Sequence, residues 1–351
     1  METATYHDPQ LPGASPAVVQ LAAASGKSQG LWASALRRLL RNRAAVLGLA
    51  IIIGFVVIAI FADQLALRPY AKQSLKDNNA IASWLPYVFT AMKPVNVPGG
   101  YAKINDAFPL GADYVGRDIL SRLLYGTRIS LAIAFIGPLI SLMFGVVFGS
   151  IAGYYGGWID SLIMRIVDLM YAFPSLLLII LMMTFFRSSL NSPPPGTFAY
   201  SLGKLDAAFG GLLFIFIGIG VTSWENMARL TRGQVLSVRQ REYVLAARAI
   251  GVPDIRILID HILPNILGPL IVAETLAIPT YIATEAFLSY IGLGVNRPVP
   301  SWGSMIAEGV QGITTYPNQA IFPALFLALA MFAFNFLGDG LRDALDPRTI
   351  N

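Results

Sequence analysis

Long apolar runs with few charged residues recur along this chain, and they restrict its fold more than any other feature. Six of them lie at about residues 44–62, 129–154, 166–186, 209–224, 266–290 and 320–337. Each approaches or exceeds the ~20 residues that an α-helix needs to cross a bilayer. Apolar residues make up 55% of the 351 residues and charged residues 13%, about half the charge of a water-soluble domain. The sequence therefore predicts an all-α polytopic membrane protein with six transmembrane helices.

Several chemical classes are excluded by what the chain lacks. It has no cysteine, so disulfides and thiolate metal sites are ruled out, and His7 and His261 form no visible ligand cluster. Gly26-Lys27-Ser28 resembles the end of a phosphate-binding loop, but Leu21 stands where that loop needs its first glycine. We find no spacing typical of serine hydrolases or metalloproteases. We therefore expect no nucleotide, cofactor or metal site and no catalytic residue in this chain.

The apolar runs divide the chain into segments. We predict a cytoplasmic tail and interfacial helix over 1–43, a first span over 44–62 and an extracytoplasmic segment over 63–128. A five-helix core over 129–341 and a cytoplasmic C-terminus over 342–351 follow. The core contains an extracytoplasmic Pro-rich loop at 188–208 and a cytoplasmic loop at 225–265. The first 30 residues lack an early apolar run, which indicates a disordered tail rather than a signal peptide. The stretch from Trp32 to Arg43 fits an amphipathic interfacial helix or a basic stop before the membrane.

The distribution of basic residues predicts the orientation. With six spans, both termini lie on one side, where we count 14 Lys and Arg against 11 on the other side. Most of those 11 lie in 63–128, which is long enough that its charges count weakly for orientation. The short segments therefore place both termini and the 225–265 loop in the cytoplasm. The net charge of +5 follows from this arrangement and does not indicate a nucleic-acid partner.

A polar, Arg-rich insert, REYVLAARAIGVPDIRILIDHILPNILG, runs from Arg241 to Gly268 between the fourth and fifth spans. Residues 239–250 favour helix, Gly251 can adopt a positive φ, and Pro253 restarts the chain at a new angle. This pattern predicts two short helices joined by a sharp bend, able to dock in a groove on a soluble partner. An ordinary basic loop on lipid headgroups is the alternative.

This insert resembles the coupling loop of binding-protein-dependent ABC permeases, which carries Glu-Ala-Ala, a glycine and a Leu-Pro pair at set spacings. Two positions depart from that pattern: Leu245 stands for the glutamate and His261 for an isoleucine. Glu242, one helical turn earlier, is the nearest carboxylate. The residues that the resemblance assigns to the ATPase-coupling surface are Arg241, Glu242, Ala246, Ala247, Arg248, Gly251, Leu263 and Pro264.

Further stretches of the sequence make the resemblance more specific. These are LWASALRRLLRNRAAVLGL, PLGADYVGRDILSRLLYGTRISL, GYYGGWIDSLIMRIVDLMYAFPSLLL, FLSYIGLG and NFLGDGLRDALDPR. In this order they are similar to the C-type permease subunit of dipeptide and oligopeptide ABC importers, over about residues 31–348. Two segments, 70–108 and 188–208, look longer than is usual for that family.

The resemblance implies a type I importer permease fold and a set of partners. These are a second, B-type permease, two cytoplasmic ATPase subunits that bind ATP and Mg, an external substrate-binding protein, a peptide substrate and the lipid bilayer. It also implies the plasma membrane of a bacterium or archaeon, which is the inner membrane where there are two. Nickel, glutathione, oligosaccharides and antimicrobial peptides remain alternative substrates. An ion-coupled secondary transporter would show ionisable residues in several spans and an inverted repeat, and we see neither.

Two sets of residues inside the spans draw attention. Glu274 and Glu285 are eleven residues apart, about three helical turns, so both project from nearly one face and predict a polar lining for the translocation path. Hydrogen bonding between helices is the alternative. Gly145, Gly149 and Gly153 recur every four residues, which indicates close packing against another helix, with a moving gate contact as the alternative.

Overall fold

The computed structural model describes residues 31–189 and 193–346, and within these residues the regular structure is helical with no strand, which confirms the all-α prediction. The helices are α2 (Leu31–Leu39), α3 (Arg43–Ile60), α4 (Ala62–Leu65), η1 (Leu75–Asp77), α5 (Leu85–Val88), α6 (Ile119–Tyr155), α7 (Gly157–Ala172), α8 (Ser175–Ser189), α9 (Phe198–Ala208), α10 (Leu213–Val238), α11 (Glu242–Ala249), α12 (Asp254–Arg256), η2 (Ile257–Ile262), α13 (Leu263–Tyr290), α14 (Trp302–Val310) and α15 (Asn318–Leu345). The predicted tail of residues 1–30, with Gly26-Lys27-Ser28, lies outside the described residues.

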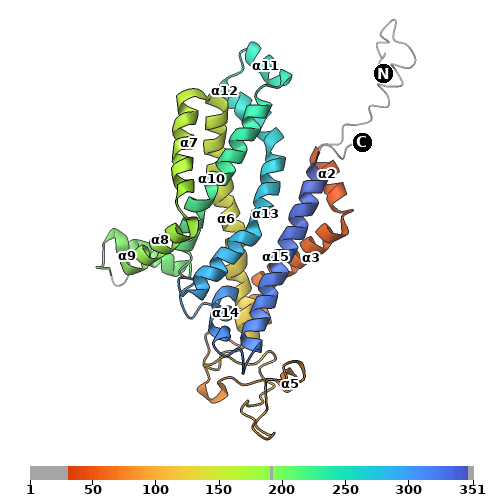
Figure 1. Ribbon diagram of the computed structural model, residues 1–351, viewed down its shortest axis with the longest axis vertical. Helices are drawn as coiled ribbons and strands as arrows, with labels where there is room; N and C mark the ends of the chain where they lie inside the picture. The colour runs from red at the N-terminus through yellow and green to blue at the C-terminus, as the bar shows by residue number, and fades with distance from the viewer. Residues whose placement is uncertain (1–30, 190–192, 347–351) are drawn as a thin grey trace, which may run out of the picture.

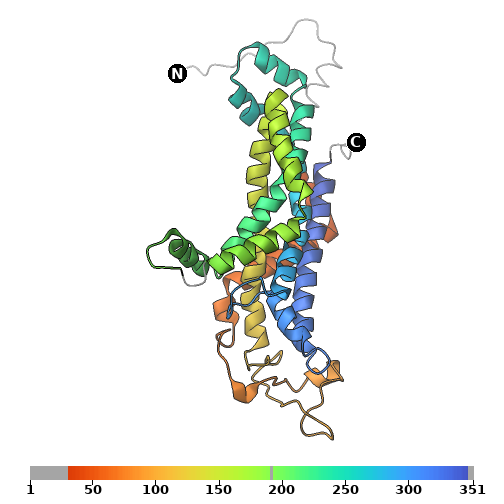
Figure 2. The ribbon, with the colours of Figure 1, turned by 60° about the vertical axis from the view of Figure 1, so that its left-hand side comes forward.

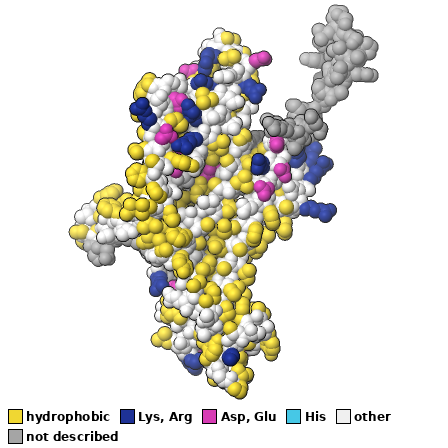
Figure 3. Space-filling model, in the orientation of Figure 1, with side chains coloured by type: hydrophobic (Ala, Val, Ile, Leu, Met, Phe, Trp, Pro, Cys, Tyr) yellow, Lys and Arg dark blue, Asp and Glu magenta, His cyan; other side chains and the backbone are white. Residues whose placement is uncertain are grey.

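The molecule is elongated, with a helical bundle between two distinct ends (Figures 1 and 2). At one end α11, α12 and η2 form a projection, residues 242–262, which we call the knob. At the other end residues 66–118, which include η1 and α5, form a compact lobe. Charged side chains gather toward the knob end and around α2, whereas hydrophobic side chains cover much of the middle (Figure 3). A hydrophobic middle between polar ends is the surface that a bilayer requires.

Four continuous helical segments are long and apolar enough to cross a membrane, and they coincide with four of the predicted spans. They are α3, α6, the α12–η2–α13 segment and α15. Of the two other predicted spans, 166–186 is broken, since α7 and α8 meet at 82° within it. The span predicted over 209–224 lies mostly within α10, which meets α9, from the predicted Pro-rich loop, at 93°. The described part of the chain therefore holds four spans, or six if each bent pair counts as one.

Each break has a local cause in the backbone. Phe173 ends α7 in an extended conformation, with ψ 134°, because it precedes Pro174 and a proline disfavours helical geometry at the residue before it. Gly210 and Gly211 separate α9 from α10, and both have positive φ values, +66° and +82°. Such φ values are accessible to glycine at little cost and turn the chain sharply.

The boundary between the fourth span and the cytoplasmic loop differs from the prediction. Helix α10 does not end near 224 but continues to Val238, well into the predicted loop 225–265. Charged residues such as Arg favour helix and do not end it, and here they also have partners on α7: the Arg232 guanidinium binds both carboxylate oxygens of Asp160, at 2.5 and 2.6 Å. This ion pair holds the extended part of α10 against α7.

Two other boundaries also differ. Helix α6 begins at Ile119, ten residues before the predicted span, because Asp118 caps it: its carboxylate accepts the backbone N–H of Ser121 at 2.7 Å. The predicted Pro-rich loop 188–208 is largely helical, since α9 occupies 198–208.

The three glycines of α6 face α10 at close range. A Cβ at Gly145 would lie 2.5 Å from the Met227 Cβ, and one at Gly153 would lie 2.9 Å from the carbonyl oxygen of Arg232. At Gly149 it would meet the carbonyl oxygen of Ala228. Backbones that approach this closely leave no room for side chains, so small residues at this face allow α6 and α10 to pack.

The lobe is held to the bundle at the start of α15. The Gln319 amide donates to Asn79 Oδ1 at 2.8 Å and to the carbonyl of Ala112 at 3.1 Å, and the Asn318 amide donates to the carbonyl of Leu110 at 2.7 Å. Inside the lobe, buried apolar residues form its own small core; they are Ile81, Ala82, Leu85, Met92 and Ala102. The lobe is thus an ordered part of the structure.

At the other end of α15, α2 packs against the C-terminal turns of that helix. Ala35 and Leu39 of α2, Ala45 of α3 and Ala344 of α15 share one buried cluster. Leu36 and Leu40, the other leucines of this amphipathic stretch, are each 56% exposed. The first and last helices that the structure describes therefore meet at the end of the bundle away from the lobe (Figure 1).

Candidate coupling surface and membrane cavity

The knob consists of a short helix, a left-handed turn and a second helical segment. Arg241 precedes α11 in an extended conformation, and Glu242 is the first residue of α11. Gly251 has a φ of +80°, a value that L side chains rarely adopt, and the chain reverses there. Pro253 then precedes α12, and Pro264, which has no N–H to donate, lies where the π-helical turn of η2 passes into α13. The local chemistry of Gly and Pro thus builds the bend expected from the sequence, but the second helix is not short, since α12 continues through η2 into α13 over Asp254–Tyr290.

One face of the knob is buried against the bundle. Val244 and Ala247 of α11 pack with Ile257, Leu258 and Ile262 in a single apolar cluster that continues into α10 and α13. Among the predicted coupling residues, Ala247 points inward, whereas Arg241, Glu242, Ala246, Arg248, Gly251 and Pro264 are exposed and Leu263 is half-buried. The knob is therefore a rigid extension of α10 and α13.

The opposite face exposes large apolar side chains at the tip. Ile250 is 82% exposed and Ile255 60%, and Leu245 and Tyr243 are also exposed. Several apolar side chains on a projecting element, rimmed by Arg241 and other polar residues, are typical of a protein-docking surface. Leu245, which departs from the Glu of the coupling-loop pattern, lies on this exposed face.

Polar contacts also join the knob to the end of α6, and sequence reasoning missed them. The Tyr154 hydroxyl donates to Asp254 Oδ1 at 2.6 Å, and Arg239 Nη1 donates to the carbonyls of Gly153 and Tyr154 at 2.8 and 3.1 Å. The Arg248 guanidinium lies 5.5 Å from the Tyr154 ring centroid. The run GYYGG that begins at Gly153 was the available signal. These contacts join the end of α6 to α12 of the knob and to Arg239, which follows α10 just before the knob.

A cavity of about 350 Å³ lies within the bundle, between α8, α10 and α13. Glu274 lines it, and the Tyr281 hydroxyl donates to Glu274 Oε1 at 2.7 Å. The other polar side chains that line it are Ser175, Thr222, Ser223, Asn226, Thr280 and Thr284. A buried carboxylate surrounded by hydroxyl and amide groups can bind a cationic or hydrogen-bonding ligand.

Glu285 lies in a different environment from Glu274. It is fully buried and does not line the 350 Å³ cavity; instead it accepts a hydrogen bond from the Ser289 hydroxyl at 2.6 Å. Its other carboxylate oxygen has no protein partner. The two glutamates that the helical spacing placed on one face are therefore separated by the packing of α13.

A third intramembrane carboxylate, Glu225 of α10, was missed. It is 5% exposed, and one of its oxygens has no hydrogen-bond partner. Because the predicted fourth span ended at Trp224, Glu225 was assigned to a solvated loop, where a carboxylate needs no explanation. With α10 continuing to Val238, the same residue lies inside a packed helix.

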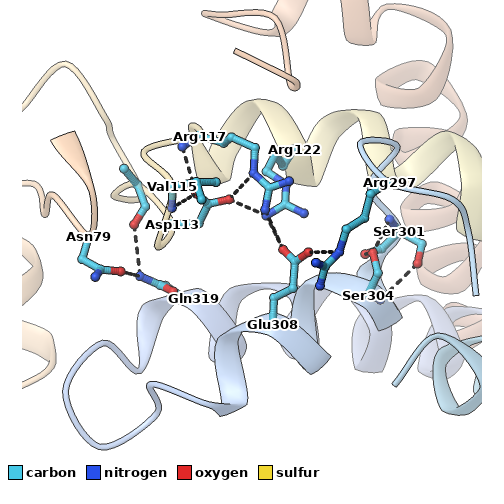
Figure 4. A network of polar contacts seen from close by, with 11 residues as sticks. Asn79, Asp113, Val115, Arg117, Arg122, Arg297, Ser301, Ser304, Glu308 and Gln319 are labelled. Atoms are coloured by element: carbon cyan, nitrogen blue, oxygen red, sulfur yellow. Dashed lines mark hydrogen bonds and ion pairs between the residues drawn. The ribbon is translucent and has the colours of Figure 1, made fainter. Parts of the chain in front are cut away.

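Near the lobe, four charged side chains form a buried network (Figure 4). Arg117 binds Asp113 at 2.6 Å and Glu308 at 2.9 Å, and Arg122 binds the same two carboxylates at 2.6 and 2.8 Å. All four side chains are at most 8% exposed. The network joins the end of the lobe, the first turn of α6 and α14. Sequence reasoning missed it, although both arginines lie in the run PLGADYVGRDILSR.

Two family models match the chain. The model for binding-protein-dependent transport system inner membrane components matches residues 145–351, and the model for the N-terminal TM domain of oligopeptide transport permease C matches residues 30–85. Together they cover both ends of the helical bundle.

Curated relatives match over nearly the whole chain. The oligopeptide transport system permease protein OppC of Bacillus subtilis is 40% identical over 92% of both chains. The dipeptide transport system permease protein DppC of the same organism is 38% identical over 92% of this chain and 86% of its own length. The glutathione transport system permease protein GsiD of Pectobacterium atrosepticum is 36% identical over 90% and 91%. A solved structure, the inward-facing MetNI methionine ABC transporter, aligns with a TM-score of 0.48 and 18% identity over 65% of this chain and 98% of that chain.

Proposed function

Because this chain belongs to the family of binding-protein-dependent transport system inner membrane components, we propose that it is the permease subunit of an ATP-driven importer for dipeptides and oligopeptides. The observation that carries the proposal is the identity with OppC and DppC permeases over about nine tenths of the chain. The match of residues 30–85 to the N-terminal domain of an oligopeptide permease supports the same substrate class.

In the membrane, the knob faces the cytoplasm and the lobe faces outward. The short basic segments support this orientation, since the residues around the knob carry six Lys and Arg and the 291–319 connection carries one. Both termini then lie in the cytoplasm. The membrane is the plasma membrane of a bacterium or archaeon, and the inner one in a cell with two.

The knob docks in a groove of a cytoplasmic ATPase subunit. Ile250 and Ile255 supply the apolar contact, and the contacts of Tyr154 and Arg239 carry the movement of the knob into α6 as well as into α10 and α13. ATP and Mg belong to the two ATPase subunits, and this chain performs no catalysis. Its role is to convert the approach and separation of the ATPases into movement of membrane helices.

The cavity beside Glu274 is this chain's share of the translocation path, and a second, B-type permease supplies the rest. The Glu274 carboxylate can pair with the ammonium end of a peptide. Glu285, which is enclosed by its own helix and α14, serves packing rather than the path. A substrate-binding protein delivers the peptide on the lobe side, ATP binding opens the path outward, and hydrolysis returns it to the inward-facing state.

The test is uptake of a labelled tripeptide into proteoliposomes that hold the whole complex. The proposal predicts uptake that needs ATP, the ATPases and the binding protein together. Competition by excess unlabelled glutathione distinguishes the second substrate class, which the similarity to GsiD favours. Uptake by this chain alone, without ATPases, would refute the importer role, and preferential uptake of glutathione over tripeptides would refute the substrate class.

A further inference from the structure

A second cavity, of about 420 Å³, lies at the lobe side of the bundle and takes no part in the proposed path beside Glu274. It is bounded by the end of α13, by the 291–301 connection and by α14. Its exposed rim includes Asn296, Arg297 and Gln311, and its inner wall includes Ser304 and Glu308. The cavity is therefore mainly polar, lies on the outward side in the proposed orientation, and is separate from the knob.

The buried charges behind this cavity balance one another. Asp113 and Glu308 are each bound by both Arg117 and Arg122, so two carboxylates face two guanidinium groups (Figure 4). Glu308 Oε2 accepts from Arg117 at 2.9 Å and from Arg122 at 2.8 Å. Its charge is compensated without any group from the rim.

Arg297 adds a positive charge to this balanced set. Its Nε lies 3.3 Å from Glu308 Oε1, and its side chain is 74% exposed. The Glu308 side chain is only 8% exposed, but the pair is long and water and salt screen its Arg297 end, so it contributes little. The guanidinium can therefore turn from Glu308 to a bound anion at small cost. Once it does so, Glu308 keeps its two buried partners.

The groups on the rim match a carboxylate. A guanidinium offers two parallel N–H donors in the geometry of a carboxylate, and the side-chain amides of Asn296 and Gln311 add further donors. Two carboxylates lie deeper. That of Glu308 belongs to the inner wall and is bound by Arg117 and Arg122, and that of Glu285 lies behind Ser289, whose hydroxyl donates to it at 2.6 Å. A volume of about 420 Å³ lies within the range of small-molecule sites, enough for the terminal residues of a peptide but not for a long chain.

We propose that this cavity is an entry subsite in which Arg297 binds the C-terminal carboxylate of an incoming peptide. The inference rests on the proposed peptide-importer function and adds to it a preference for a free carboxylate over an amide. The subsite receives the carboxylate end at the outer mouth, while the cavity beside Glu274 suits the ammonium end. An acidic side chain of the docked binding protein carries the same chemistry, and the experiment separates the two sources.

Because this chain has no cysteine, Tyr290→Cys places a single thiol of the chain on the cavity rim, where Tyr290 is 53% exposed. A small trifluoromethyl tag on that thiol reports occupancy by ¹⁹F NMR. The sample is the whole permease–ATPase complex without binding protein, with partner subunits free of reactive thiols. The probes are a tripeptide and its C-terminal amide. We expect the tripeptide to shift the signal saturably and the amide to bind about tenfold more weakly.

The variants Arg297→Gln and Arg297→Lys test the residue itself. We expect Arg297→Gln to bind the tripeptide as weakly as its amide and Arg297→Lys to keep part of the difference. The exposed side chain predicts that both variants fold, which the thermal midpoint of the complex checks. Equal binding of tripeptide and amide in the wild type, or a difference that survives in Arg297→Gln, overturns the proposal.

Two further measurements distinguish the subsite proposal from docking of the binding protein and from the importer proposal. If Arg297→Gln weakens docking of the peptide-free binding protein but leaves the tripeptide–amide difference intact, the carboxylate belongs to the binding protein and the subsite proposal is wrong. Peptide-stimulated ATPase activity of the wild type is measured on the same complex with binding protein added. If that stimulation is present while the tripeptide–amide difference is absent, the subsite fails and the importer stands. If stimulation is absent, the importer proposal itself fails, and with it the subsite.

Discussion

The contact between α6 and α10 gives a prediction whose size follows from the structure. In Gly145→Ala, the added Cβ would lie 2.5 Å from the Met227 Cβ and 3.0 Å from the Ala228 backbone nitrogen. Carbon atoms in contact prefer about 3.5–4.0 Å, so the two helices must separate by roughly 1 Å. Neither atom can rotate away, because one is a Cβ and the other belongs to the backbone. The shift therefore has to be made by the helices themselves.

Overpacking of this kind typically costs about 1–3 kcal/mol, and the better helix propensity of alanine returns up to ~1 kcal/mol. We expect Gly145→Ala to destabilise the complex by about 1–2 kcal/mol. The matched control is Gly233→Ala on α10, which is exposed and has no atom within 4 Å of its added Cβ. That control should be neutral or slightly stabilising, since only propensity changes.

The assay is the thermal midpoint of the purified complex in one detergent, measured at one scan rate because membrane complexes unfold irreversibly. We expect Gly145→Ala to fall a few degrees below wild type and Gly233→Ala to stay level or rise. If Gly145→Ala matches or exceeds Gly233→Ala, the close approach of the two backbones described here is incorrect.

Three further changes have defined outcomes. Tyr154→Phe removes a charge-assisted hydrogen bond worth about 1.5–3 kcal/mol between α6 and the knob. It should lower the amount of peptide imported per ATP hydrolysed, whereas the control Tyr155→Phe should not. An unchanged ratio in Tyr154→Phe argues against transmission through Tyr154. Glu308→Gln leaves the positive charge of two buried guanidinium groups without one of its carboxylates, at a cost of about 3–5 kcal/mol. It should make the lobe far more sensitive to protease than the control Asp106→Asn does. Equal protease resistance of the two variants contradicts the network. Glu274→Gln should reduce tripeptide uptake while basal ATPase activity persists, and unaltered uptake removes Glu274 from the path.

The continuous spans could be predicted because each is a long apolar run whose length alone decides the outcome. The broken ones were within reach of local rules: Pro174 follows a residue that it forces into an extended conformation, and Gly210-Gly211 allows a left-handed turn. Hydropathy averages over such residues and therefore does not reveal a bend at either place.

The extent of α10 and the buried charges depend instead on tertiary partners. Arg232 pairs with Asp160 on α7, and no local sequence pattern indicates that pairing. Arg117 and Glu308 are 191 residues apart in sequence, so their contact exists only once the lobe and α14 are assembled. Glu274 and Glu285 likewise share a helix but have different neighbours, which the spacing along one helix does not determine.

The bend of the knob was the part of the site that the local sequence predicts best, since Gly251 and Pro253 fix a turn by their own backbone preferences. Which side chains face outward depended on the packing beneath it. Ala247 is buried by Ile257 and its neighbours, whereas Ile250 is left at the tip.

The central claim is that motion reaches this chain through the tip of the knob. Ile250→Glu places a charge where an 82% exposed apolar side chain would dock, and Ile250→Val keeps the site apolar. The measurement is ATPase activity of the reconstituted complex with binding protein, with and without a tripeptide, after gel filtration has shown which subunits remain associated. The account predicts peptide stimulation in wild type and Ile250→Val, and its loss in Ile250→Glu. Full stimulation in Ile250→Glu would contradict it.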